Sequence, residues 1–185
     1  MSDFKLMLQD HQEVMRSLES LLPKLDTASQ LVISCLKSGG KLMLCGNGGS
    51  AADSQHIAAE IVGRFETERK ALPAIALTTD TSILTAVGND YGYESIFSRQ
   101  VQALAAPGDV LIGYSTSGNS ANVIKAVEEA KKSGCKIITL TGKGGGALAG
   151  LADIDLCANS SSTARIQEAH AFLGHALCSA VDQAF

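Results

Sequence analysis

The stretch KLMLCGNGGSAADSQHIAAE, residues 41–60, contains the pattern that indicates the fold class. Its first six residues form a short apolar run that is typical of a buried strand, and the glycines after it suit a tight turn. From Ser50 the spacing of apolar residues becomes helical, and we expect the Ser50 hydroxyl to cap a helix that runs to about Val62. A strand that leads through a glycine turn into a helix is one unit of an alternating α/β fold.

The same alternation continues to the end of the chain, which predicts five strands and their helices. Further strands are expected at 73–79, 109–117, 135–142 and 154–158, and further helices at 81–87, 119–133 and 163–184. The strands are nearly continuous apolar runs, as in parallel sheets that are covered on both faces. We therefore predict an α/β fold with a five-stranded parallel sheet flanked by helices on both faces, whose ligands bind at the carboxyl ends of the strands.

Residues 1–38 precede the first strand and have the apolar spacing of two helices. The junction is expected near Pro23, and the glycines of SGGK (38–41) should end the second helix. Neither helix connects two strands, so we expect them to cover the sheet or to pack in an oligomer. The length of 185 residues fits a single domain, 1–185.

Composition excludes several classes of protein. The net charge is −4 and no run of lysine or arginine occurs, which argues against nucleic acid as a partner. No apolar stretch approaches the ~18 residues of a membrane span, and the N-terminus lacks the layout of a signal peptide. The five cysteines are odd in number and form no CxxC pair, which predicts free thiols in a reducing compartment. We expect a cytoplasmic protein.

The glycine turn at 46–51 reads G-x-G-x-x-A, which matches the dinucleotide-binding fingerprint. That fingerprint needs an acidic residue at the end of the second strand, whereas Glu66 and Glu68 precede the predicted strand. The Walker pattern is absent, because no Gly-Lys-Ser/Thr follows. The turn therefore either serves the strand-to-helix connection alone or lets a different ligand approach the backbone.

A second polar turn, STSGNSANV (115–123), follows the third strand and opens a helix. Hydroxyls and backbone N–H groups at a helix N-terminus can hold a phosphate without lysine. An ordinary Ser/Thr cap accounts for one or two of the hydroxyls but not for all four, which belong to Ser115, Thr116, Ser117 and Ser120. Two such turns at two strand ends predict one pocket, with the sugar at the first turn and the phosphate at the second.

Two helices carry residues suited to chemistry. His56 and Glu60 are four residues apart and share a helix face, and Gln167 and His175 lie on one broad face of the closing helix. The set suits zinc coordination through nitrogen and oxygen, or the acid and base of an aldose–ketose interconversion. A buried side chain satisfied by the backbone is the alternative for each one, and it is our interpretation of His170.

Asn89 and Asp90, in VGNDYGYE, are expected to form a third polar turn that either caps a loop or recognises sugar hydroxyls.

Taken together, the motifs CGNGGSAADSQHIAAE, AVGNDYGYESIFSRQV, STSGNSANVIKA and RIQEAH…GH resemble the phosphoheptose isomerases of the sugar isomerase (SIS) domain class. The likeness covers nearly the whole chain in order and is weaker in residues 1–35. Ala164 stands where some members carry an acid. The resemblance implies the SIS fold, a flavodoxin-like three-layer architecture.

The resemblance also implies an activity and an assembly. The activity is conversion of sedoheptulose 7-phosphate to D-glycero-D-manno-heptose 7-phosphate through an enediol(ate), the first step toward ADP-heptose and the lipopolysaccharide core. The assembly is a homotetramer with active sites between subunits and one Zn²⁺ per subunit.

Residue roles carried over from the resemblance fall into three groups. The implied substrate contacts are Asn47, Gly48, Gly49, Ser50, Glu60, Asn89, Asp90 and Gln167, and the implied phosphate contacts are Ser115, Thr116, Ser117 and Ser120. The implied metal ligands are His56, Glu60, Gln167 and His175. Glu60 would be the base and His175 the acid. Because a metal lowers the pKa of a bound carboxylate, either Glu60 leaves the zinc when substrate arrives or zinc polarises the carbonyl.

Two non-catalytic alternatives remain open at this point. One is a related SIS tetramer that binds the bacterial replication initiator and lacks the proton-transfer glutamate, and the other is a sugar-phosphate sensor. Because this chain keeps Glu60 together with both histidines, the sequence favours the enzyme.

Overall fold

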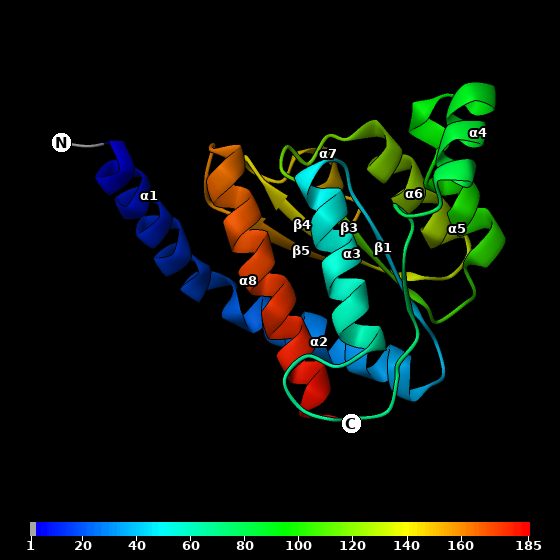
Figure 1. Cartoon of the computed structure of the whole chain (residues 1–185), viewed down its shortest axis with the longest axis horizontal. Coiled ribbons are helices and arrows are strands. Elements are labelled where there is room, and N and C mark those ends of the chain that lie inside the picture. Colours follow the sequence, from blue (N-terminus) through cyan, green and yellow to red (C-terminus); the bar gives the residue numbers. More distant parts are fainter. Residues whose placement is uncertain (1–2) are drawn as a thin grey trace.

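The computed structural model describes residues 3–185 and has one parallel five-stranded sheet (Figure 1). The strands are β1 (Leu42–Cys45), β2 (Ala74–Ala76), β3 (Val110–Ser115), β4 (Lys136–Gly142) and β5 (Ile154–Ala158). Their order across the sheet is β2-β1-β3-β4-β5, and every neighbouring pair is parallel. The predicted fold class is therefore confirmed.

Helices cover both faces of the sheet (Figure 1). One face packs against α2 (Leu22–Lys37), α3 (Gly49–Val62) and α8 (Thr163–Asp182), and α1 (Asp3–Ser17) lies outside α8. The other face packs against α5 (Ser98–Leu104), α6 (Ala121–Lys132) and α7 (Gly146–Ala149), with α4 (Thr81–Tyr91) beyond them. Two short 3₁₀ turns, η1 (Leu18–Leu21) and η2 (Tyr93–Ser95), complete the elements.

The strand register brings the polar turns to one edge. Every residue of β1 and β3 is buried, which agrees with the continuous apolar runs of the sequence. Ser115 at the end of β3 is the register partner of Thr141 near the end of β4. Because parallel strands end at the same edge, the turns after β1, β3 and β4 lie next to one another.

The structure differs from the sequence predictions about local structure in several places. The helix predicted at 81–87 continues to Tyr91, because the Asp80 carboxylate accepts from the Ile83 N–H at its start and Gly92, at φ 88°, ends it. Asn89 and Asp90 are thus helical and do not form a turn. The strand predicted at 73–79 is only three residues long. The helix α5, in SRQVQAL, was not predicted from the sequence.

Ser50 does not cap α3. The helix begins one residue earlier, at Gly49, with Gly48 as the N-cap in a positive-φ conformation of 57°. Because the chain turns at Gly48, Ser50 falls inside the first helical turn, where its side chain is buried. The end of α2 is as predicted, since Gly39 follows the cap at φ 83°.

The N-terminal helices pack on α8 but leave an apolar surface open. The Arg165 guanidinium donates to the Met7 carbonyl, and His11 Nδ1 lies 2.8 Å from Glu168 Oε2. On the outer side of α1, Phe4 is 78% exposed, and Leu6 and Leu8 are also exposed. Within the described part of the chain, no helix is long and apolar enough to cross a membrane.

Candidate active site

The turn after β1 is tied to the start of α6 by side-chain amides. Asn47 Nδ2 donates to Asn122 Oδ1 and Asn122 Nδ2 donates to Asn47 Oδ1, each at 2.8 Å. The Tyr93 hydroxyl also donates to Asn47 Oδ1, at 3.1 Å. Asn122 is buried and was not singled out from the sequence, because only the fold brings it to Asn47. The first and second polar turns therefore form one rigid rim.

The hydroxyl-rich turn after β3 forms a compact cradle. Ser115 Oγ lies 2.8 Å from Ser120 Oγ and 3.4 Å from Ser117 Oγ, and Thr116 beside them is half-buried. Ser120 is the N-cap of α6, yet its side chain makes no cap hydrogen bond. At the same edge α3 also begins without a side-chain cap. Two positive helix ends and their N–H groups thus face this edge, an arrangement suited to phosphate.

Farther along α3, the structure brings together His56, Glu60 and His175. The two Nε2 atoms lie 2.8 Å apart, and His56 Nε2 lies 3.7 Å from Glu60 Oε1. The His175 ring stacks on Phe65, with centroids 5.2 Å apart, and meets the His56 ring edge-on. His56 is exposed while Glu60 is partly buried, so the cluster is open to a ligand on one side and fixed on the other.

A buried ion pair holds the two helices of this cluster together. Arg69 Nε donates to Asp182 Oδ1 at 2.8 Å, and both side chains are almost fully buried. The same guanidinium donates to the carbonyls of Glu60 and Ile61 at the end of α3. Desolvation raises the pKa of Asp182, but the N–H groups of residues 66 and 67 and the Arg69 guanidinium outweigh it and lower that pKa to about 2.

The structure does not bring three of the predicted residues to this cluster. Gln167 lies eight residues before His175, about 12 Å along the α8 axis. Its amide instead packs on the backbone of Gly49, where an added Cβ would overlap it. Asn89 and Asp90 are exposed on α4, with Asn89 Nδ2 donating to Asp90 Oδ1. Within one chain, α4 lies on the face of the sheet opposite to α3 and α8, which carry the cluster.

The donor types fit zinc, although their arrangement in the single chain is incomplete. Two imidazole nitrogens converge, and a carboxylate oxygen lies beside them. In a tetrahedral zinc site two such nitrogens lie about 3.3 Å apart, slightly more than the 2.8 Å found here. Across residues 3–185, no three His, Cys, Asp or Glu side chains already stand in a metal-holding arrangement.

Two buried polar atoms behind the cluster lack hydrogen-bond partners among the described residues. They are Asp53 Oδ2, one turn before His56, and the Tyr114 hydroxyl. Burial raises the pKa of Asp53, and the nearby His56 partly offsets this increase. Burial and the charge of Asp53 both raise the pKa of Tyr114. Buried groups of this kind normally bond to protein or water, so they mark a place for an ordered water or a ligand hydroxyl. No pattern in the sequence identified Asp53.

The remaining histidine and the cysteine beside the glycine turn have structural explanations. His170 is fully buried, its Nε2 donates to the Thr141 carbonyl at 2.9 Å, and burial lowers its pKa to about 4. Burial raises the pKa of Cys45 to about 12, so it is no reactive thiolate. In residues 3–185 all five cysteines are free thiols.

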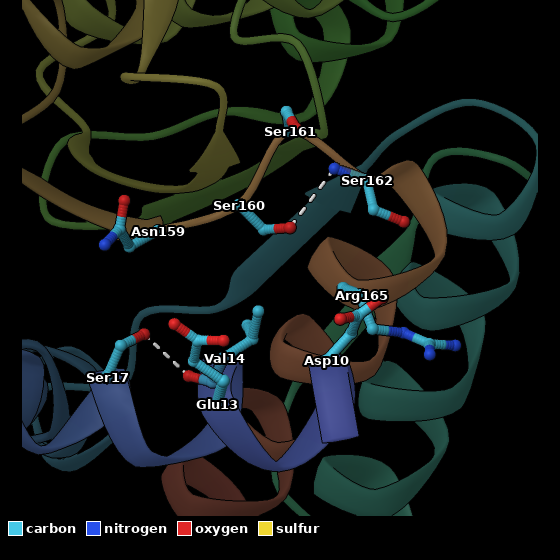
Figure 2. Close-up of a pocket in the computed structure, with 9 residues that line it drawn as sticks. All are labelled: Asp10, Glu13, Val14, Ser17, Asn159, Ser160, Ser161, Ser162 and Arg165. Carbon is cyan, nitrogen blue, oxygen red and sulfur yellow. Dashed lines mark hydrogen bonds between the residues drawn. The ribbon is translucent and has the colours of Figure 1, made fainter. Parts of the chain in front are cut away.

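A separate cavity of about 390 Å³ lies between α1 and the loop that leads into α8 (Figure 2). Its polar lining includes Asp10 and Glu13 as well as Ser160. The Arg165 guanidinium points away from the serines (Figure 2) and donates to the Met7 carbonyl and to Glu168. None of the predicted site residues lines this cavity. The carboxylates there disfavour an anion, so we place the chemistry at the His56 cluster.

Known proteins match this chain over most of its length. A family model described as SIS domain matches residues 8–142. A phosphoheptose isomerase of Nitratiruptor sp. is 58% identical over 179 residues, which cover 96% of both chains. One from Campylobacter concisus is 55% identical over 96% of this chain and 94% of its own. The solved structure of a phosphoheptose isomerase from Neisseria gonorrhoeae superposes with a TM-score of 0.93 at 46% identity, over 98% and 97% of the two chains.

Proposed function

The chain belongs to the phosphoheptose isomerases of the SIS domain family, and we propose that its site converts sedoheptulose 7-phosphate to D-glycero-D-manno-heptose 7-phosphate. It is an isomerase, and the matches at high identity give no support to an initiator-binding protein or a sensor. The observation that carries the proposal is that the phosphate cradle is tied to the turn where α3 begins, while His56 and Glu60 lie farther along α3 and meet His175 of α8.

The length of α3 fits a seven-carbon substrate. Gly49, at the rim of the cradle, lies seven residues before His56, which is about 10.5 Å along the helix axis. In sedoheptulose 7-phosphate eight bonds separate C1 from phosphorus, and an extended chain covers about 9 to 10 Å at ~1.2 Å per bond. With its phosphate at the hydroxyl turn, the substrate therefore places C1 and C2 at the cluster.

The cluster then supplies a base and an acid. Glu60 takes a proton from C1 of the open-chain ketose while His175 gives a proton to the C2 oxygen, which yields an enediol. Return of a proton to C2 and loss of the proton on the C1 oxygen produce the aldose. Phe65, stacked on His175, keeps that ring in position, and the Arg69–Asp182 pair fixes the end of α3 that carries Glu60.

We propose Zn²⁺ as the metal of this site, with His56, Glu60, Gln167 and His175 as its ligands. The donor types support this set, and Gln167 would have to leave Gly49 to join it. A bound zinc ion would polarise the substrate carbonyl. Because Glu60 cannot be a strong base while it is bound to the metal, and His175 cannot give a proton from a metal-bound nitrogen, both have to be free of the metal during the proton transfers.

The proposal extends to an assembly. The exposed apolar side chains of α1, and an α4 without a single buried residue, support a homotetramer in which these surfaces are covered. Asn89 and Asp90 on α4 would then contact substrate in a site between subunits, and the glycine turn Asn47–Ser50 would line it. We place the protein in the cytoplasm, at the first step toward ADP-heptose and the lipopolysaccharide core.

A turnover assay tests the function. Purified protein is incubated with sedoheptulose 7-phosphate, with and without a chelator, and the aldoheptose phosphate is followed by NMR. We expect product from the untreated protein and less product after chelation. Product that survives chelation would assign the chemistry to Glu60 and His175 without a metal. No product from folded protein would refute the isomerase and favour the initiator-binding alternative or the sensor.

A further inference from the structure

Lys143 follows β4 in a turn whose backbone is unusual for lysine. The Gly145 N–H donates to the Gly142 carbonyl at 3.0 Å, so Lys143 and Gly144 are the two central residues of a β-turn. Their φ angles are 53° and 81°. Turns with two positive φ angles favour glycine, asparagine and aspartate at these positions. Within residues 3–185 Lys143 is the only non-glycine residue with positive φ, and such strained positions cluster at functional sites.

This turn is built directly on the phosphate cradle. The Leu148 N–H donates to the Gly118 carbonyl at 3.0 Å, and the Ala147 N–H donates to Asn119 Oδ1 at 3.0 Å. An added Cβ at Gly118 would overlap the Gly145 carbonyl, so the two backbones touch. Ser115, the first serine of the cradle, pairs in register with Thr141 of β4. Lys143 follows Thr141 by two residues, so it lies just past the end of the neighbouring strand.

Lys143 is also the cation available at this edge. The segments that follow the five strands are 46–50, 77–81, 116–120, 143–147 and 159–163, and Lys143 is the only lysine or arginine in them. Asp155, the acid beneath this turn, already accepts from the hydroxyls of Thr139 and Thr141, at 2.7 and 2.8 Å.

The other lysines of the chain are mostly committed elsewhere. Of the ten lysines, Lys5 and Lys143 alone make no ion pair, side-chain hydrogen bond or contact over an aromatic ring with another described residue. Lys5 is exposed on α1, whereas Lys143 is exposed beside the cradle. Lys143 is thus an unpaired lysine on a turn whose backbone contacts the cradle, and a dianionic phosphate held by hydroxyls and N–H groups alone lacks such a cation.

We infer that Lys143 is a substrate-binding residue whose ammonium contacts the phosphate held by the Ser115–Ser120 turn. The inference rests on the proposed sugar-phosphate site. It explains why a lysine occupies a backbone position that asparagine or glycine would fill with less strain. It also supplies a positive charge for substrate binding in a chain whose net charge is −4.

The test compares variants of Lys143 that keep the turn. Lys143→Asn and Lys143→Gly tolerate positive φ but lack the charge, and Lys143→Arg keeps it. Lys136→Asn is the matched control, because it removes the same charge from the other end of the same strand, where Lys136 forms an exposed pair with Asp153. Binding of inorganic phosphate is measured by calorimetry, KM and kcat with sedoheptulose 7-phosphate, and Tm by thermal unfolding.

We expect Lys143→Asn and Lys143→Gly to weaken phosphate binding and to raise KM about tenfold, with kcat nearly unchanged and Lys143→Arg close to wild type. Tm should stay the same or rise by about 2 °C, because the strain is relieved. Lys136→Asn should bind phosphate like the wild type.

Two results would overturn the inference: phosphate affinity that is unchanged in Lys143→Asn, and a loss that is matched by Lys136→Asn. A wild-type protein that binds no phosphate would overturn it together with the cradle. Phosphate binding that depends on Lys143 without any turnover would support the inference while refuting the isomerase proposal.

Discussion

Removing the charge of Asp182 is expected to loosen the two helices that carry the catalytic cluster. In Asp182→Asn, Arg69 stays buried at 1% side-chain exposure without a counter-charge. Breaking a buried pair by removing one partner costs about 3 to 5 kcal/mol. The control is Glu68→Gln, which removes an exposed i,i+4 pair with Arg64 and should cost less than about 0.5 kcal/mol.

The same ion pair predicts how this cost depends on pH. The pKa of Asp182 falls from 3.8 to about 2 in the folded protein, which at 1.36 kcal/mol per unit corresponds to roughly 2 kcal/mol of stability. Because the folded pKa is lowered, this stability is complete above about pH 4 and is lost as the pH falls toward 2.

Urea unfolding of the wild type and Asp182→Asn at a fixed protein concentration, from pH 7 downward, measures both quantities. The difference in unfolding free energy between the two proteins should be constant above about pH 4 and shrink below it. A difference under about 1 kcal/mol at pH 7, or one that does not shrink in acid, would refute the role of this pair.

Three further predictions concern the site and its support. Glu60→Gln should abolish turnover and leave Tm within a few degrees of wild type, measured by NMR assay and thermal unfolding; full activity would remove Glu60 from the mechanism. His170, with its pKa lowered from 6.5 to about 4, should make the wild type lose up to roughly 3 kcal/mol of stability between pH 6.5 and 4, because the unfolded chain takes up the proton first. In a His170→Gln variant, the unfolding free energy measured by urea titration should not show this fall between pH 6.5 and 4. An unchanged fall in the variant would contradict the role of His170. Gln167→Ala should lower zinc retention after dialysis by about tenfold, measured as bound metal per chain, and unaltered retention would argue against Gln167 as a ligand.

The layers of the fold could be predicted because each buried strand is a continuous apolar run. β1 and β3 are covered on both faces, so the sequence shows no alternation that might be mistaken for a one-sided strand. α5 was missed because its seven residues include only two large apolar ones, Val101 and Leu104. β2 was predicted too long because it lies at the sheet edge, where few of its residues pair.

The candidate site shows where local patterns stop being informative. The proximity of His56 and Glu60 follows from helix geometry alone, whereas their contact with His175 depends on how α3 packs on α8. Asn122 and Arg69 bind partners that are 75 and 113 residues away in the sequence, and no spacing rule reports such pairs. Lys143 was overlooked for a related reason, since the strain of its turn is visible only in the backbone angles.

Solvent deuterium incorporation during turnover examines the proton transfer assigned to Glu60. Protein is incubated with sedoheptulose 7-phosphate in D₂O, and C2 of the aldoheptose product is examined by NMR, for wild type and for Glu60→Gln. Proton transfer through an enediol by Glu60 predicts deuterium at C2 in the wild type and neither product nor exchange in the variant. Product formed by Glu60→Gln at a rate near that of the wild type, with or without deuterium at C2, would contradict the role of Glu60 as the base.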